Sequence, residues 1–188
     1  MTASSPVTLG AVIGSLREGS FHRIVFENAQ ELLPDGVSLT EIPIVDLPFF
    51  NQDLEGPDGP DSVLAFQAAV DALDGLVFFS PEYNGGVPAV TKNAVDWASR
   101  PRGDAPIHGL SVLVVGATPG RHDVPNVREA LSKTAQSAGG RVFERSIGLS
   151  SISRRIEDRR VDAEIRAELE AALAAFVEFV RTPADTDD

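Results

Sequence analysis

The segment covering residues 76–100, LVFFSPEYNGGVPAVTKNAVDWASR, constrains the fold of this chain more than any other stretch. It opens with four apolar residues between Gly75 and Pro81, a pattern typical of a strand buried on both faces of a sheet. A loop with two adjacent glycines follows, and Pro88 then marks the first turn of a helix, where its missing N–H costs nothing. The segment therefore predicts a strand, a glycine loop and a helix, with loop amides suited to bind a flat or anionic group.

The rest of the chain repeats this alternation of short apolar runs and helical patterns. Further strands are expected at Val7–Ile13, 37–44, 111–115 and 142–147, with Pro43 breaking the second. Asp61 or Ser62 is expected to cap the second helix. The apolar faces of the predicted helices are formed by Phe21, Val25, Ala29 and Leu32; by Val63, Phe66, Val70 and Leu73; by Val90, Ala94, Trp97 and Ala98; by Val127, Ala130, Leu131, Thr134 and Ala138; and by Ile165, Leu169, Leu173, Phe176 and Val180.

Roughly five strands alternating with five helices predict an α/β fold, a three-layer sandwich with a five-stranded parallel sheet and helices on both faces. Ligands of such sheets bind beyond the carboxyl ends of the strands, where the strand order reverses. In the order 2-1-3-4-5 this reversal lies between the first and third strands. Those strands are followed here by residues 14–20 and 80–86, so we expect both loops to form one site.

Length and composition bound the organisation of the chain. Its 188 residues predict a single domain over residues 1–182 and an acidic disordered tail over 183–188. No apolar run is long enough for a membrane span, and the N-terminus lacks the basic and apolar regions of a signal peptide. The chain has no cysteine, which excludes disulfides and thiolate chemistry and agrees with a cytoplasmic location.

Charge and histidine placement exclude other classes of function. The net charge of −12 argues against binding to nucleic acid or to anionic membranes, and a phosphate ligand would need its own local site. The histidines His22, His108 and His122 are scattered without metal-ligand spacing, so no metal site is expected.

The first loop offers several donors for a phosphate group. These are the hydroxyls of Ser15 and Ser20, the planar guanidinium of Arg17, the backbone amides at the helix start, and His22 as a further candidate. The pattern fits a plain helix cap equally well, with Ser20 as the cap and Arg17 as a solvated charge. The loop is neither a Walker loop nor GxGxxG, which disfavours ATP and a Rossmann-bound dinucleotide.

The second loop offers the backbone amides of residues 82–86 and the side chains of Tyr83 and Asn84. These groups could hydrogen bond to the edge of a flat heterocycle. Taken alone, however, the loop is better explained as a strand-to-helix turn with Tyr83 on the surface.

Together, GSLREGSFHR and PEYNGGVPAVTKNAVDWASR resemble the two fingerprints of the NAD(P)H-dependent FMN reductases, which include quinone, chromate and azo-dye reductases with a flavodoxin-like fold. The resemblance extends from the first strand to about residue 120, with a weaker match through the last helix. The chain departs from the family at His22, where Asn is common, and at residues 122–124, where a Gly-Gly pair is common.

The resemblance implies FMN as the cofactor and assigns residues to each of its ends. The FMN-binding residues that it implies are Ser15, Arg17, Ser20, Phe21 and His22 at the phosphate, Pro81, Glu82, Tyr83, Asn84 and Gly85 at the isoalloxazine, and Thr118 in the turn after the fourth strand. The amides of residues 84–86 are expected near the N1–C2=O edge of the ring.

The implied function is transfer of two electrons from NADPH or NADH through FMN to a quinone, chromate, azo compound or free flavin. No catalytic residue is expected, because the flavin carries the chemistry. One alternative is a flavodoxin-type electron carrier that is not reduced by nicotinamide; Arg17 favours the enzyme, because carriers usually lack this arginine. A third possibility is a sheet protein of this fold that binds a different ligand or a protein partner. A homodimer or homotetramer is implied as well, with Phe49 and Phe50 expected to cover the flavin or a partner subunit.

Overall fold

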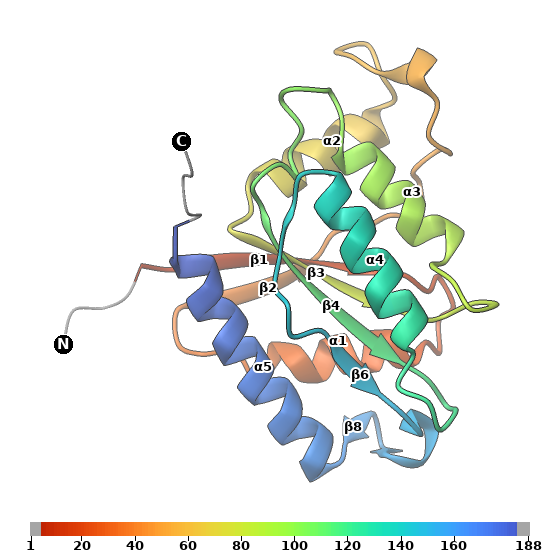
Figure 1. The fold of residues 1–188 in the computed structure, drawn as a ribbon, viewed down its shortest axis with the longest axis vertical. Helices are drawn as coiled ribbons and strands as arrows, with labels where there is room; N and C mark the ends of the chain where they lie inside the picture. Colours follow the sequence, from red (N-terminus) through yellow and green to blue (C-terminus); the bar gives the residue numbers. More distant parts are fainter. Residues whose placement is uncertain (1–4, 184–188) are drawn as a thin grey trace.

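The computed structural model describes residues 5–183 and follows the predicted alternation of elements (Figure 1). The strands are β1 (Val7–Ile13), β2 (Val37–Glu41), β3 (Gly75–Ser80), β4 (Ser111–Ala117), β5 (Arg141–Val142), β6 (Ile147–Leu149), β7 (Ile156–Glu157) and β8 (Arg160–Val161). The α-helices are α1 (Phe21–Gln30), α2 (Asp61–Asp71), α3 (Ala89–Ala98), α4 (Pro125–Ser137) and α5 (Ala163–Arg181), with short 3-10 helices η1 (Gln52–Leu54) and η2 (Ile152–Arg154). Residues 184–188 of the predicted tail lie outside the described residues, so the tail and the domain boundary stay predictions.

The main sheet confirms the predicted fold class and strand order. Its order is β2-β1-β3-β4-β5, with β6 also paired to β4, and every pair is parallel. Helices α1 and α5 cover one face, and α2, α3 and α4 cover the other (Figure 1). Within residues 5–183 no helix is long and apolar enough to cross a membrane.

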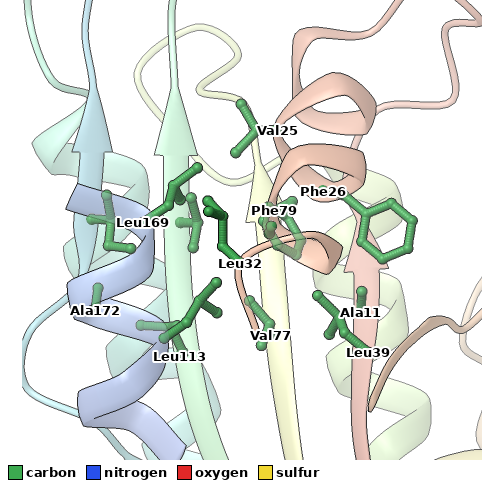
Figure 2. Packing of buried hydrophobic residues seen from close by; sticks show 14 of the residues in the cluster. Ala11, Val25, Phe26, Leu32, Leu39, Val77, Phe79, Leu113, Leu169 and Ala172 are labelled. Atoms are coloured by element: carbon green, nitrogen blue, oxygen red, sulfur yellow. The ribbon is translucent and has the colours of Figure 1, made fainter. Parts of the chain in front are cut away.

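The alternation of side chains along the central strands divides the core between the two faces. Val77 and Phe79 of β3 belong to the cluster that packs against α1 and α5 (Figure 2). Leu76 and Phe78 of the same strand point to the opposite cluster, against α2, α3 and α4. Burial on both faces explains why this strand is apolar throughout, and each fully buried side chain of this size contributes about 1.5–3 kcal/mol.

Three local predictions are wrong. The last strand, expected over 142–147, is split into β5 and β6 by residues 143–146, and each part pairs with a different stretch of β4. Strand β2 ends at Glu41, before Pro43, rather than reaching residue 44. Neither Asp61 nor Ser62 caps α2, because Pro60 occupies the cap position without a side-chain hydrogen bond and Asp61 is already helical.

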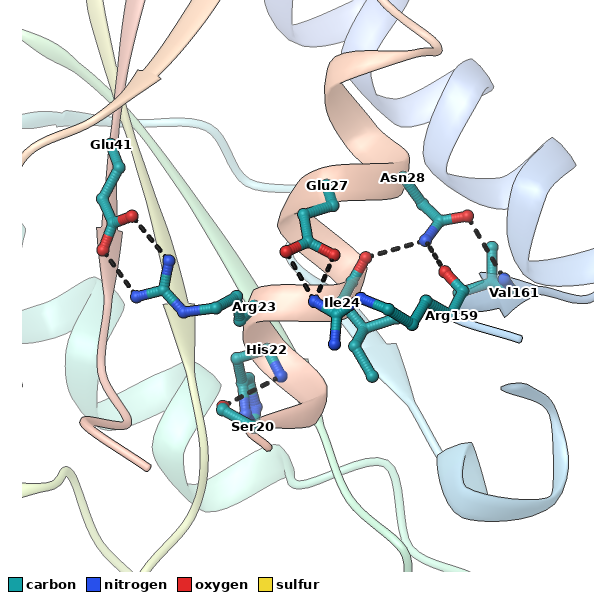
Figure 3. A network of polar contacts seen from close by, with 9 residues as sticks. All are labelled: Ser20, His22, Arg23, Ile24, Glu27, Asn28, Glu41, Arg159 and Val161. Carbon is teal, nitrogen blue, oxygen red and sulfur yellow. Dashed lines mark hydrogen bonds and ion pairs between the residues drawn. The ribbon is translucent and has the colours of Figure 1, made fainter. Parts of the chain in front are cut away.

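A small hairpin, β7–β8, was not predicted and is fastened to α1 (Figure 3). The buried amide of Asn28 donates to the backbone oxygen of Arg159 at 2.8 Å, and its side-chain oxygen accepts from the N–H of Val161 at 3.2 Å. Arg159 also pairs with Glu27 at 2.5 Å. The hairpin therefore closes the edge of the α1–α5 layer through one buried amide and a surface ion pair.

Candidate functional site

Three loops meet where the central strands end. They follow β1, β3 and β4, which are neighbours in the sheet, so their starting points lie side by side. The hydroxyl of Tyr83 in the second loop lies 3.3 Å from the hydroxyl of Ser15 in the first. The two loops that the sequence assigned to one site are thus in direct contact, at the predicted reversal of strand order.

The first loop leaves a run of backbone donors without protein partners. The amides of residues 15–19 donate no hydrogen bond to any other described residue. Arg17 is exposed, has no ion-pair partner among residues 5–183, and places its guanidinium 5.7 Å from the centre of the Phe21 ring. Free amides, a free guanidinium and the positive end of α1 together form a cradle suited to an anion.

Ser20 caps α1, because its side-chain oxygen accepts from the N–H of His22 at 3.2 Å. The helix-cap interpretation is therefore correct for this serine. It does not exclude a ligand, since the hydroxyl hydrogen remains free to donate to a second acceptor. The side chain of Arg17, in contrast, takes no part in the cap; only its backbone oxygen accepts a hydrogen bond, from the N–H of Ser20.

Gly14 brings the first loop unusually close to α3. A Cβ added at Gly14 would lie 2.2 Å from the hydroxyl oxygen of Thr91 and 3.1 Å from that of Ser80. Both hydroxyl residues are fully buried. Only glycine permits this approach, so residue 14 fixes how near the anion cradle lies to the start of α3.

The second loop ends in a tight turn. Tyr83 and Gly86 exchange both backbone hydrogen bonds at 3.1 Å, and the residues between them adopt left-handed conformations, with φ of 52° at Asn84 and 77° at Gly85. This is the geometry that favours Asn-Gly pairs. The expectation that the amides of Tyr83 and Gly86 are free is wrong, because both are bonded inside the turn. The amides of Glu82, Asn84 and Gly85 donate to no other described residue.

The side chain of Glu82 leaves the loop and reaches α4. Its carboxylate accepts from the backbone N–H of Val127 and from the side-chain amide of Asn126, both at 3.2 Å. The second loop is therefore fixed to the helix that follows β4.

His22 occupies a different position from that expected of a phosphate donor. The ring is buried, and its Nε2 accepts from the backbone N–H of Ala117 at 3.2 Å, while the backbone of Ser80 also hydrogen bonds to the ring. Burial, with a smaller contribution from the nearby Arg17 guanidinium, lowers the pKa of His22 to about 4. The imidazole is thus neutral near pH 7 and ties the start of α1 to the ends of β3 and β4.

Thr118 lies in a turn held by the segment after β6. Its N–H donates to Leu149 at 2.9 Å, and its backbone oxygen accepts from Ile152 at 2.9 Å. Its hydroxyl oxygen accepts from the N–H of Gly120 at 3.1 Å. The third loop is therefore braced at the edge of the site, with Thr118 half-buried at its rim.

A family model described as NADPH-dependent FMN reductase matches residues 7–152. The chain belongs to this family. An NAD(P)H-dependent FMN reductase of Pseudomonas aeruginosa is 34% identical over 131 residues, which cover 70% of each chain. A quinone reductase of Pseudomonas putida is 37% identical over 117 residues, covering 62% of this chain and 63% of the relative. The aligned regions thus span about two thirds of these relatives' own length.

Solved structures extend the likeness of this FMN reductase over nearly its whole length. The flavoenzyme FerB of Paracoccus denitrificans, an NAD(P)H:acceptor oxidoreductase, superposes with a TM-score of 0.84 at 28% identity, covering 93% of this chain and 97% of that one. An FMN-dependent NADH-azoreductase of Bacillus anthracis, solved with FMN, has a TM-score of 0.58 at 14% identity and shares the fold.

Sequence reasoning missed four residues that shape this reductase site: Ser80, Thr91, Asn126 and Val127. Ser80 and Thr91 lie in the motif that was quoted, but nothing in the pattern indicates that their hydroxyls meet Gly14. Asn126 and Val127 meet Glu82 across more than forty residues of chain. No local pattern signals such a contact.

Proposed function

We propose that this FMN reductase uses NADPH or NADH to reduce quinones and similar small acceptors through bound FMN. Its family is that of the NADPH-dependent FMN reductases, and relatives named quinone reductase support the acceptor class. The observation that carries the proposal is the meeting of two loops rich in unpartnered amides at the reversal of strand order. One loop suits an anion and the other suits the edge of a flat ring, which are the two ends of FMN.

The first loop would hold the phosphate. The amides of residues 15–19 and the hydroxyls of Ser15 and Ser20 supply hydrogen bonds, and Arg17 supplies a charge-assisted fork. Phe21 would support the guanidinium from below, at the 5.7 Å separation of the two groups. His22 then acts through the strand ends that it joins, because its neutral ring is engaged with the backbone of Ser80 and Ala117.

The second loop would hold the ring. Pro81, Glu82, Tyr83, Asn84 and Gly85 line this end, with Thr118 at the neighbouring turn. When bound, FMN supplies the redox chemistry by accepting a hydride and passing on two electrons. The chain's own residues orient the ring and leave one face open, and the free amides of Asn84 and Gly85 would stabilise negative charge on its edge.

We also propose a homodimer or homotetramer, in a reducing cytoplasm. Asn93 accepts from the N–H of Phe50 at 2.7 Å and donates to the oxygen of Pro48 at 2.9 Å. Phe50 is half-buried and packs edge-on against Trp97, with ring centres 5.0 Å apart, so part of its ring is already covered within this chain. Phe49 remains 77% exposed on this fastened segment, which supports a subunit contact there. Size-exclusion chromatography that gives a monomer would contradict the oligomer.

A flavodoxin-type carrier is not favoured, because the matching family and the relatives named above are reductases. The two functions differ in one measurement. The apoprotein is loaded with FMN and mixed anaerobically with NADPH or with NADH. We expect the flavin band to bleach and to return on addition of a benzoquinone. Failure of both nicotinamides to bleach the flavin would leave only the carrier, and a protein that binds no FMN would refute the proposal.

A further inference from the structure

Helix α4 begins without a cap of its own. Its N-cap residue, Val124, makes no side-chain cap and adopts a left-handed conformation, with φ of 50° and ψ of 54°. A β-branched residue rarely takes this conformation. Packing holds it there: Val124 is buried, and a Cβ added at Gly116 of β4 would lie 2.5 Å from its Cγ2. The first amides of α4 therefore need a partner from elsewhere.

Glu82 supplies that partner. One carboxylate oxygen accepts from the N–H of Val127 in the first turn, and the other accepts from the side-chain amide of Asn126. An anion at this position also interacts favourably with the positive end of the helix. Arg128, the next residue of α4, is turned away toward Asp123 and Ser146, so it does not compete for the carboxylate.

The anchored side chain constrains the backbone that carries it. Glu82 follows the buried Pro81 and immediately precedes Tyr83, where the tight turn begins. Its own N–H is one of the three loop amides with no partner among residues 5–183. The hydrogen bonds from α4 to the Glu82 carboxylate therefore restrain the position of the Glu82 amide and of the turn that follows it.

We propose that Glu82 is a positioning residue, whose carboxylate caps α4 and thereby holds the unpartnered amides of Glu82, Asn84 and Gly85 in place for the flavin ring. This inference rests on the proposed function. It assigns the carboxylate to α4 and only the backbone of Glu82 to the cofactor. The side chain then affects binding at the ring end of FMN and has no part in binding the phosphate.

Riboflavin, which has the ring but no phosphate, separates the two ends. The dissociation constants of FMN and riboflavin are measured by quenching of flavin fluorescence with the natural apoprotein and with Glu82→Ala and Glu82→Gln. We expect Glu82→Ala to weaken both flavins by about tenfold, the scale of one or two hydrogen bonds. Glu82→Gln retains one acceptor oxygen and should lose only about threefold for both.

Two variants calibrate the experiment. Glu129→Ala removes the same charge from an exposed position of α4, where Glu129 pairs with Lys133, and should leave both affinities unchanged. Arg17→Ala should weaken FMN and spare riboflavin. Unchanged affinities in Glu82→Ala, or a loss confined to FMN, would overturn the inference.

A second route covers the case in which circular dichroism shows Glu82→Ala to be unfolded. Asn126→Ala removes the donor to one carboxylate oxygen from an exposed side chain, and we expect both flavins to weaken by about two- to threefold. Unchanged binding in both Asn126→Ala and Glu82→Gln would overturn the positioning role. If the natural protein binds neither flavin, the proposed function itself fails.

Discussion

Gly85 and Gly86 are adjacent in the sequence but face different constraints. Gly85 has φ of 77°, which an L-residue adopts at a cost of about 1–2 kcal/mol, although a Cβ there would meet nothing within 4 Å. Gly86 has no left-handed backbone, and a Cβ there would meet only the Tyr83 oxygen, at 3.9 Å. The sequence places the amides of both glycines near the edge of the ring, whereas the geometry makes Gly85 the constrained position.

We therefore expect Gly85→Ala to weaken flavin binding by about 5- to 30-fold, as the strained turn changes shape, and Gly86→Ala to leave it within about twofold. Titration of each apoprotein with FMN measures this. Equal effects of the two substitutions would show that the conformation of the turn does not control the site.

Arg17 offers a second test at the residue scale. Because its guanidinium has no ion-pair partner among the described residues, its removal breaks no ion pair and should change protein stability by no more than about 1 kcal/mol, through the lost contact with Phe21. FMN affinity should fall by about 1.5–3 kcal/mol, the contribution of a charged hydrogen bond. Arg154→Ala, at another exposed arginine, is the matched control. Equal affinities of Arg17→Ala and Arg154→Ala for FMN would remove Arg17 from the phosphate site.

His22 makes stability depend on pH in one direction. Its pKa is about 4 in the folded chain and about 6.5 when unfolded, so between these values the unfolded chain binds the extra proton. Stability is then full above pH 6.5 and falls as the pH drops toward 4, by about 3 kcal/mol in total.

Urea unfolding at pH 7.5 and pH 5.5 measures this slope. The natural protein should lose about 1.4 kcal/mol more than His22→Asn over that interval, because asparagine does not titrate. His108→Asn, at an exposed histidine, should behave like the natural protein. Identical pH slopes for all three proteins would mean that the buried ring does not titrate as described.

At the scale of elements, α3 does more than cover the sheet. The side chains of Asn93 and Trp97 both donate hydrogen bonds to the backbone oxygen of Pro48, at 2.9 and 2.8 Å. These bonds attach the long connection between β2 and α2 to α3. Asn93→Ala should leave the partly buried N–H of Phe50 without a partner and destabilise the protein by about 1–3 kcal/mol.

Limited proteolysis should then cut within residues 46–60 faster than in the natural protein. Asn51→Ala is the control, because Asn51 lies in the same connection but caps only the exposed helix η1. If the two variants are cut at the same rate, α3 does not restrain this segment.

Elements with strong signals could be predicted from the sequence. The apolar run of β3, the glycine turn and Pro88 led directly to the strand, loop and helix that are observed. Short strands at the edge of the sheet could not be predicted in the same way. Residues 141–149 mix charged and apolar residues, so nothing in the sequence indicates the break between β5 and β6. Hairpin β7–β8 was missed because its turn uses Asp158 and Arg159 at positive φ, where glycine or asparagine is the usual mark.

For the site, too, the sequence predicted the main segments but not the contacts of individual side chains. The two loops and their meeting point follow from topology, because parallel strands that are neighbours in the sheet, such as β1 and β3, place their carboxyl ends together. The roles of individual side chains do not follow. Whether Glu82 faces the ring or α4, and whether His22 faces the loop or the strand ends, depends on contacts between segments far apart in the chain.

At the scale of the whole molecule, the net charge and the local charge of the site have opposite signs. The chain carries a net charge of −12, whereas the first loop presents unpartnered amides and the guanidinium of Arg17. NADPH is itself an anion, so it meets long-range repulsion before it meets the cradle. Raising ionic strength from 0.01 to 0.15 M shortens the reach of that repulsion from about 30 to about 8 Å. Bleaching of the flavin at limiting NADPH should therefore quicken, while reoxidation by an uncharged quinone should not change. Slower bleaching in salt would mean that the cradle's local field dominates the encounter.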